Sequence, residues 1–172
     1  MTLEVTCKRE NSTLKRRELR RWLKSAKTAS ERALELADED VFTFNAYLRS
    51  RWGREQGARK VLGSGQGGNA LLRKATEIPL EVAGTALKGL GFCADSAEFV
   101  YRDVAADLDS AALILYASAW GALGSARANL LSVDRKTRYH ARLISKADDL
   151  EREALQLLDR VRACTSRRKS RR

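Results

Sequence analysis

The amino-acid sequence predicts an all-α fold, in which about four main long helices, some of them kinked or broken, form an antiparallel bundle. Two observations support this prediction: the 172 residues contain one proline, and apolar residues recur every three or four positions over long stretches. The chain length suits one ordinary domain, and a hydrophobic content of 44% is enough to build its core. We therefore expect a single helical domain over residues 1–165, followed by a disordered basic tail over residues 166–172.

The first long helix is expected to begin after Asn11-Ser12-Thr13, whose side chains can cap free amide groups, and to end near Arg51. Apolar positions spaced three and four residues apart form one stripe along it, which indicates a single face turned toward a partner. The stripe consists of Leu19, Trp22, Leu23, Ala26, Ala29, Ala33, Leu36, Ala37, Val41, Phe44, Tyr47 and Leu48.

The rest of the chain repeats this helical pattern. Residues 63–68 contain four glycines and predict a flexible loop. Pro79 should kink the helix that follows, and Gly89 and Gly91 should end it. The remaining helices are predicted over residues 69–90, 94–133 and 135–164.

Since helices of thirty or more residues are longer than one small core can cover, we also expect a homodimer.

The net charge of +11 is concentrated at the two ends of the chain. Residues 1–32 hold ten basic and four acidic side chains, residues 167–172 hold five basic and none acidic, and the segment between them is neutral. A dedicated nucleic-acid domain usually spreads basic residues over one folded face with aromatic or amide side chains nearby. This distribution makes a nucleic-acid partner unlikely.

Several other classes of protein are excluded by the sequence. No stretch approaches the ~20 apolar residues of a membrane-spanning helix, and the N-terminus lacks the apolar region of a secretory signal, so we expect a soluble, cytoplasmic protein without a membrane partner. The three cysteines are widely spaced and the single histidine, His140, has no cysteine near it in sequence, which excludes disulfide scaffolds and zinc modules.

Two acidic residues fall on the apolar stripes. Asp40 lies three residues after Ala37 and four before Phe44, while Asp38 and Glu39 point away from that side. An enclosed carboxylate costs several kcal/mol unless it is paired, hydrogen-bonded or protonated, so Asp40 is a candidate functional residue. The alternative is that it binds a helix end, an arginine or a water-filled groove.

Weaker candidates follow the same pattern. Asp109 lies between apolar positions of the third helix, and Asn129 lies on the same helix.

The glycines of residues 63–68 could present amide groups to an anion. They lack the preceding strand and the lysine of a nucleotide-binding loop, so a plain linker is favoured. Cys93 and Cys164 have no charged surroundings and read as buried or incidental thiols.

Three segments resemble the cyclodeaminase/methenyltetrahydrofolate cyclohydrolase family, known also as the second domain of formimidoyltransferase-cyclodeaminase. Residues 36–44 are similar to the family's acidic D-x-D-x-x-x-F stretch, and residues 70–83 are similar to its Ala-rich helix with a Val/Ile-Pro-Leu motif. Residues 103–130 resemble a third region, in which Asp109 and Asn129 match a family aspartate and asparagine. The resemblance covers roughly residues 3–160.

The resemblance implies an all-helical homodimer that acts on a one-carbon unit carried by tetrahydrofolate, without a metal. Such an enzyme either expels ammonia from 5-formimidoyltetrahydrofolate as the methenyl bridge closes or adds water to that bridge. Asp40 matches the family's catalytic aspartate and would act as general acid or base. Asp109 and Asn129 would orient the pterin or the reacting water. From charge alone, the candidates to attract the anionic glutamate tail are Lys8, Arg9, Arg16 and Arg17, for which a solvated helix face is the favoured alternative.

The chain departs from the family at its start. The family's "PGGGS" loop and the Ala-rich helix after it are not present before residues 3–9, which resemble the segment that follows them. Two other functions are therefore considered. One is a non-catalytic helical interaction protein that keeps the fold and the dimer, and the other, ranked last, is a nucleic-acid-binding protein that uses both basic ends.

Overall fold

A computed structural model of the chain describes residues 2–10, 12–55 and 67–170. The regular secondary structure of these residues is helical. No strand occurs among them, which confirms the all-α prediction. The loop predicted over residues 63–68 lies outside the described residues, except that Gly67 and Gly68 begin a helix. The elements are α1 (Thr2–Arg9), α2 (Thr13–Glu55), α3 (Gly67–Ser96), the short 3-10 helix η1 (Arg102–Val104), α4 (Ala105–Leu130) and α5 (Arg138–Ser170).

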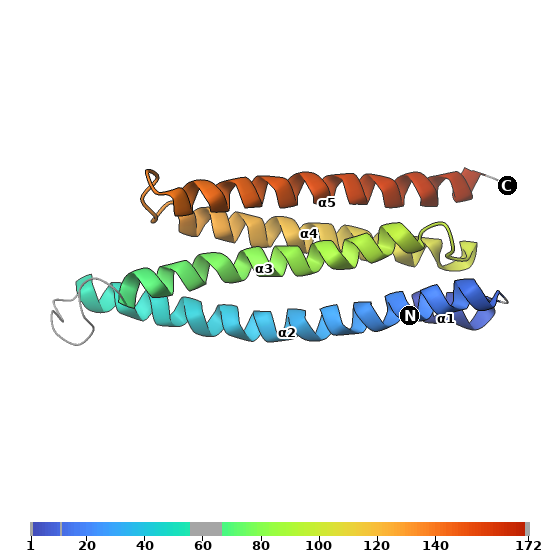
Figure 1. Cartoon of the computed structure of the whole chain (residues 1–172), viewed down its shortest axis with the longest axis horizontal. Helices are drawn as coiled ribbons and strands as arrows, with labels where there is room; N and C mark the ends of the chain where they lie inside the picture. The colour runs from blue at the N-terminus through green and yellow to red at the C-terminus, as the bar shows by residue number, and fades with distance from the viewer. Residues whose placement is uncertain (1, 11, 56–66, 171–172) are drawn as a thin grey trace.

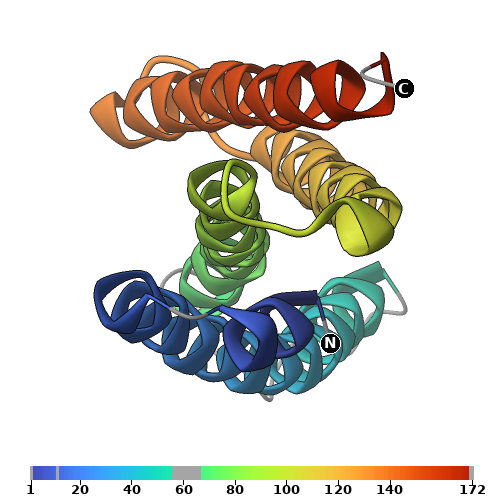
Figure 2. The same cartoon turned by 90° about the vertical axis from the view of Figure 1, so that its right-hand side faces the viewer.

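The four long helices alternate in direction along one axis, as Figure 1 shows, so the predicted antiparallel bundle is confirmed. Viewed along that axis, α3 and α4 lie side by side in the middle of the molecule (Figure 2). Helix α2, together with α1, covers one side of this pair, and α5 covers the opposite side. Each long helix except α2 therefore packs against two or more long neighbours, whereas α2 packs mainly on α3.

The core is made by α3, α4 and α5. Two clusters of buried apolar residues, one in each half of the bundle, both join these three helices. Leu90 and Leu123 are 0% and 1% exposed and are among the largest fully buried side chains. The main members of the first cluster are Leu87, Leu90, Val100, Leu108, Ala154, Leu158 and Val161, and those of the second are Leu80, Ala83, Leu123, Ala126, Leu130, Leu143 and Ala147.

Helix α2 buries part of the predicted stripe. Leu19, Leu36 and Tyr47 are buried as predicted, and Thr43 is buried with them, whereas Val41 and Phe44 are 62% and 41% exposed. The prediction for these two residues was wrong because α2 carries two adjacent apolar stripes. Periodicity identifies both stripes but does not say which one the neighbouring helix covers.

Two predicted helix boundaries were also wrong. Helix α3 continues through Gly89 and Gly91 to Ser96. Gly89 is needed for close packing, since a Cβ atom there would lie 3.1 Å from a Leu115 methyl group of α4. The helix predicted over residues 94–133 is broken between Ser96 and η1, where Phe99 leaves the helix and packs against Trp22 of α2 with ring centroids 5.5 Å apart.

The chain ends are more helical than the sequence predicted. Residues 2–9 form α1, and α5 continues to Ser170, so it includes most of the basic segment that was expected to be disordered. Arginine and lysine are good helix formers, and positive charge near a helix C-terminus interacts favourably with the helix dipole. Both segments lie at the same end of the bundle (Figure 1).

Candidate functional site

Asp40 lies on the side of α2 that packs on α3. Its neighbours on that side, Leu36 and Thr43, are buried, and Asp40 itself is half-buried, whereas Asp38 and Glu39 are exposed, as predicted. Burial raises the pKa of the Asp40 carboxyl above its ordinary value. No hydrogen bond or ion pair to its carboxylate is found among the described residues. A desolvated carboxylate of this kind is suited to holding or accepting a proton.

A groove opens between α2 and α3 near Asp40, which is itself not among the residues that line it. Its volume is about 340 Å³, and Glu39 and Thr43, which flank Asp40 in the sequence, lie in its wall. The groove combines apolar surface with charged side chains of both signs, which suits a ligand with an aromatic body and polar edges. Its lining residues are Glu39, Phe42, Thr43, Leu71, Lys74, Glu77, Ile78 and Glu81.

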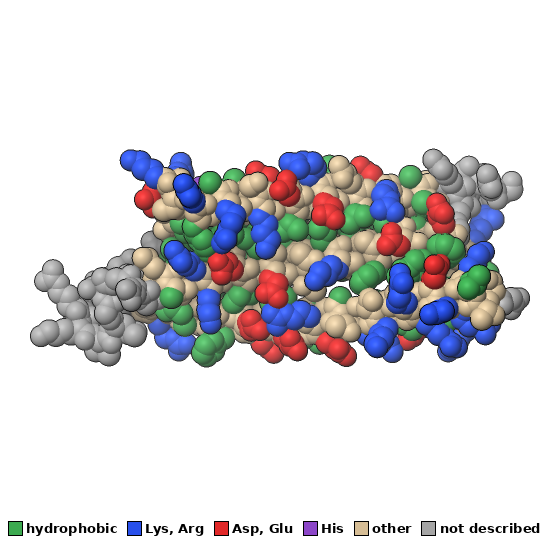
Figure 3. Space-filling model, in the orientation of Figure 1, with side chains coloured by type: hydrophobic (Ala, Val, Ile, Leu, Met, Phe, Trp, Pro, Cys, Tyr) green, Lys and Arg blue, Asp and Glu red, His purple; other side chains and the backbone are tan. Residues whose placement is uncertain are grey.

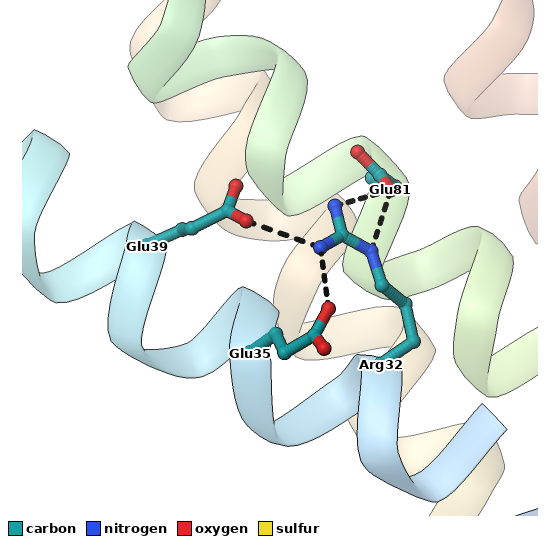
Figure 4. Close-up of polar contacts among 4 residues, drawn as sticks. All are labelled: Arg32, Glu35, Glu39 and Glu81. Atoms are coloured by element: carbon teal, nitrogen blue, oxygen red, sulfur yellow. Dashed lines mark hydrogen bonds and ion pairs between the residues drawn. The ribbon is translucent and has the colours of Figure 1, made fainter. Parts of the chain in front are cut away.

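Arg32 joins the two walls of this groove, as Figure 4 shows. Its guanidinium donates to Glu81 of α3 at 2.7 Å and to Glu35 and Glu39 of α2 at 2.9 and 3.1 Å. These hydrogen bonds, that to Glu81 first, raise the already high pKa of Arg32. The sequence analysis missed this cluster. The spacing of Arg32, Glu35 and Glu39 on one helix was visible in the sequence, but the proximity of Glu81 was not.

A second groove, of about 520 Å³, lies between α3 and α5 and shares Glu77 and Glu81 with the first. Close to it, the Tyr139 hydroxyl donates to Glu77 at 3.1 Å, and the guanidinium of Arg73 lies 4.8 Å from the Tyr139 ring centre. Burial, reinforced by Glu77, raises the pKa of Tyr139 to about 12. Glu77 is therefore oriented by a phenol that stays protonated at neutral pH. This residue was also missed by sequence reasoning.

An apolar hollow of about 510 Å³ lies between α1, α2, α3 and α4. The facing surfaces of α2 and α3 carry small side chains there, among them Ala29, Ala33 and Ala86, so the two helices leave space between them. Figure 3 shows the surface opened between α2 and α3. Asp40 lies two helical turns beyond Ala33, toward the groove described above.

The predicted site residues fall into two groups. Asn129 of α4 lies against α3 at Ala75, to whose carbonyl oxygen its Nδ2 atom donates at 2.7 Å, and Asp40 belongs to the same half of the bundle. Asp109 is half-buried near the other end of α4, about 30 Å from Asn129 along the helix. Asp109 therefore does not share one small site with Asn129 in a single chain.

The basic residues at the N-terminus belong with Asp109 rather than with Asp40. Arg9 forms an ion pair with Asp103 at 3.0 Å, and its carbonyl oxygen accepts a hydrogen bond from Tyr101. The Arg16 guanidinium donates to the Glu10 carbonyl oxygen. Arg9 and Arg16 thus fasten α1, whereas the exposed Lys8 lies at a shallow pocket of about 440 Å³, between α1 and α2, that Arg20 also lines.

No group of three His, Cys, Asp or Glu side chains is placed to hold a metal ion in the part of the chain that the structure describes. Among the same residues, no helix is long and apolar enough to cross a membrane.

The fold and the groove define a class of protein: an all-α antiparallel bundle with a carboxylate beside a cleft between two helices. The sequence assigns the protein to a particular family within this class. A sequence model of the formiminotransferase-cyclodeaminase family matches residues 1–149, and the chain belongs to that family. This confirms the resemblance found in the sequence.

Structural comparison agrees with this assignment. The fold is similar to the crystal structure of formiminotetrahydrofolate cyclodeaminase from Thermotoga maritima, with a TM-score of 0.84 and 18% sequence identity. The superposition covers 96% of this chain and 78% of that chain. A search of curated protein sequences finds no significant match.

Proposed function

We propose that the protein is a folate-interconverting enzyme of the cyclodeaminase or cyclohydrolase type, with Asp40 as the proton-transfer residue. Membership of the family supports a tetrahydrofolate derivative as substrate. The observation that carries the role of Asp40 is its half-buried carboxyl with a raised pKa, next in the sequence to Glu39, which lines the groove between α2 and α3. Both reactions move a proton at a folate nitrogen or at a water molecule, which a positioned carboxyl group can give or accept.

A carboxyl group with a raised pKa serves both reactions. In cyclodeamination, N10 of the folate attacks the formimidoyl carbon and its proton passes to the imino nitrogen. A protonated Asp40 gives a second proton to this nitrogen, which leaves as ammonia as the methenyl bridge forms. In hydrolysis, an ionised Asp40 accepts a proton from the water that attacks the methenyl carbon. Burial favours the protonated carboxyl of Asp40 and brings the protonated and ionised forms closer in energy at neutral pH.

Other residues of the groove suit a pterin. Phe42 is 72% exposed at its rim and offers an aromatic face for stacking. Glu39, Glu77 and Lys74 provide acceptors and a donor for the polar edge of the ring. Asp109, Asn129, Lys8 and Arg9 remain predicted substrate-binding residues. The separation of Asp109, Lys8 and Arg9 from Asp40 restricts them to a distant part of the substrate or to a second site.

Enzyme assays test this proposal directly. Ammonia release from 5-formimidoyltetrahydrofolate and loss of the methenyl absorbance distinguish the two activities. We expect Asp40→Asn to lower the active reaction about 100-fold or more, since general acid–base catalysis contributes typically 10²–10⁴-fold. Asp38→Asn, on the exposed side of the same helix turn, is the matched control and should keep the wild-type rate.

Two outcomes contradict the proposal in different ways. An unchanged rate in Asp40→Asn would remove the assignment of this residue but keep the activity. A folded helical protein that binds no folate would instead favour the non-catalytic interaction protein.

We further propose that the outer face of α4 forms a homodimer interface. Residues 110–126 contain no charged side chain, although α4 has one side open to solvent, where Ile114 and Trp120 are 67% and 56% exposed. A helix that is apolar all round is normally covered all round. Gly121 and Gly124 have no atom within 4 Å of a Cβ position, which leaves room for the helix of a second copy.

Sedimentation velocity tests the dimer. Trp120→Asp should shift the protein to monomer, because a charge in an apolar contact is costly. Glu153→Lys, at an exposed position of α5, is the control and should leave the dimer intact. A wild-type protein that stays monomeric at tens of micromolar would contradict the interface.

The candidate function ranked last is nucleic-acid binding through the basic ends of the chain. Arg17, Arg20 and Lys24 are exposed along the first turns of α2, and the end of α5 lies at the same end of the bundle (Figure 1) but on the opposite side of the α3–α4 pair (Figure 2). Fluorescence anisotropy should then show binding of DNA or RNA that falls steeply with salt and disappears when residues 167–172 are removed. Absence of binding at low salt would exclude this function.

A further inference from the structure

The single proline of the chain lies in the interior of α3 and is buried. In an α-helix, the N–H group of residue 79 would donate to the carbonyl oxygen of Ala75, but proline has no N–H group. Ala75 is 1% exposed, so water has little access to this carbonyl. Buried backbone carbonyls are almost always paired, and this one has lost its helical donor.

The missing donor comes from α4. The Nδ2 atom of Asn129 lies 2.7 Å from the Ala75 carbonyl oxygen. Because a carbonyl oxygen only accepts hydrogen bonds, the side-chain atom that faces it must be the amide nitrogen. The neighbouring hydroxyl of Thr76 cannot replace it, since this hydroxyl already donates to the Leu72 carbonyl at 2.7 Å.

We propose that Asn129 is a positioning residue that supplies, from α4, the hydrogen bond that Pro79 cannot make within α3. The bond joins α4 to the turn of α3 whose other side chains, Lys74, Glu77 and Ile78, line the groove beside Asp40. Asn129 therefore holds one wall of the groove in place without entering it. The hydrogen-bond role does not depend on the proposed folate chemistry.

A double-mutant cycle measured by urea denaturation tests this pairing. Asn129→Ala should raise the unfolding equilibrium constant about tenfold in the wild-type background. In the Pro79→Ala background the same change should raise it less than about threefold, because the introduced alanine has an N–H group for the Ala75 carbonyl. An equal effect in both backgrounds would overturn the proposal.

The Asn129→Asp variant gives an independent readout. At neutral pH its carboxylate would face the Ala75 carbonyl oxygen, whereas the protonated carboxyl can donate to it. The folded-state pKa of the introduced group should therefore lie above its unfolded value of about 3.9, and its stabilising contribution should be present below that pH and lost as the pH rises through the folded pKa.

We expect the stability of Asn129→Asp relative to the wild type to recover as the pH falls from 7 to 4, and we expect Pro79→Ala to weaken that recovery. Asn45→Asp, at an exposed position of α2, is the matched control and should show no such recovery. A deficit of Asn129→Asp that is independent of pH would contradict the proposal even if Asn129→Ala fails to fold.

Discussion

Helix α2 differs from the three long helices that follow it in how it uses its apolar residues. Helices α3, α4 and α5 together form both core clusters, to which α2 contributes no buried residue. Among the described residues of α2, Leu34, Val41 and Phe42 are 70%, 62% and 72% exposed. The bundle is therefore a three-helix core with α2 packed on it as a fourth, less buried helix.

This difference explains where the candidate site lies. Helices α3, α4 and α5 share the buried core and leave a groove between α3 and α5, whereas α2 meets α3 through small side chains, a half-buried carboxylate and the Arg32 cluster. Grooves form along such a seam because neither helix fills the space between them. Stability and function are thus assigned to different helices of one bundle.

The largest change in the free energy of unfolding should come from shortening a side chain in the core of α3, α4 and α5. Leu123→Ala should lower the free energy of unfolding by about 2–5 kcal/mol, because it leaves a cavity around a side chain that is 1% exposed. Leu34→Ala in α2 should change it by less than about 0.5 kcal/mol. Urea denaturation measures both. Similar losses would show that α2 belongs to the core after all.

The second largest effect should be a loss of stability at alkaline pH, where the buried Cys93 ionises. Burial raises the pKa of Cys93 in α3 to about 11, so its stabilising contribution is present below the unfolded pKa near 8.5 and is lost as the pH rises toward 11. Between pH 8 and 11 the wild type should lose about 2 kcal/mol more than Cys93→Ala. At pH 8, Cys93 should also react with thiol reagents more slowly than the half-buried Cys7.

Asp40 should respond to pH in the same sense as Cys93 but at lower pH, where a carboxyl group titrates. Because burial raises the folded-state pKa of Asp40, its contribution to stability is present below its unfolded pKa and is lost as the pH rises through the folded value. At pH 7, Asp40→Asn should therefore be slightly more stable than the wild type while losing activity. A variant that loses both would assign Asp40 a structural role.

The smallest effect should come from the ion pairs on the core side. Arg127 of α4 bonds Asp148 and Glu151 of α5 at 2.8 and 2.6 Å, but both acids are substantially exposed. Arg127→Gln should cost about 1 kcal/mol or less, and the difference should shrink in high salt. A loss comparable to that of Leu123→Ala would mean that ion pairs, rather than apolar burial, hold α4 against α5.

Sequence periodicity predicted the core helices more accurately than α2. In α4 the apolar positions Ala112, Ala119, Leu123, Ala126 and Leu130, which recur at three-, four- and seven-residue intervals, are all buried. In α2 the prediction failed at Val41 and Phe44, since two apolar stripes were available and α3 covers only one.

The candidate site could be predicted in part. Asp40 was identified because the sequence shows an acidic residue three positions after Ala37 and four positions before Phe44, both of which are apolar. Its groove was not, because Lys74, Glu77 and Glu81 join Asp40 and Arg32 only through the packing of α3 on α2. The pairing of Asn129 with the turn before Pro79 was likewise hidden, since 54 residues separate Asn129 from Ala75.

By itself, the sequence determined that this protein is helical, that it has one domain's worth of core and that it belongs with a family of folate enzymes, because composition, periodicity and short motifs are local properties of the chain. Only the tertiary structure decided which face of α2 is buried, which residues border the groove and that α1 and the C-terminal end of α5 lie at one end of the bundle. These features depend on the direction and alignment of whole helices, and that alignment follows from contacts between residues far apart in the sequence.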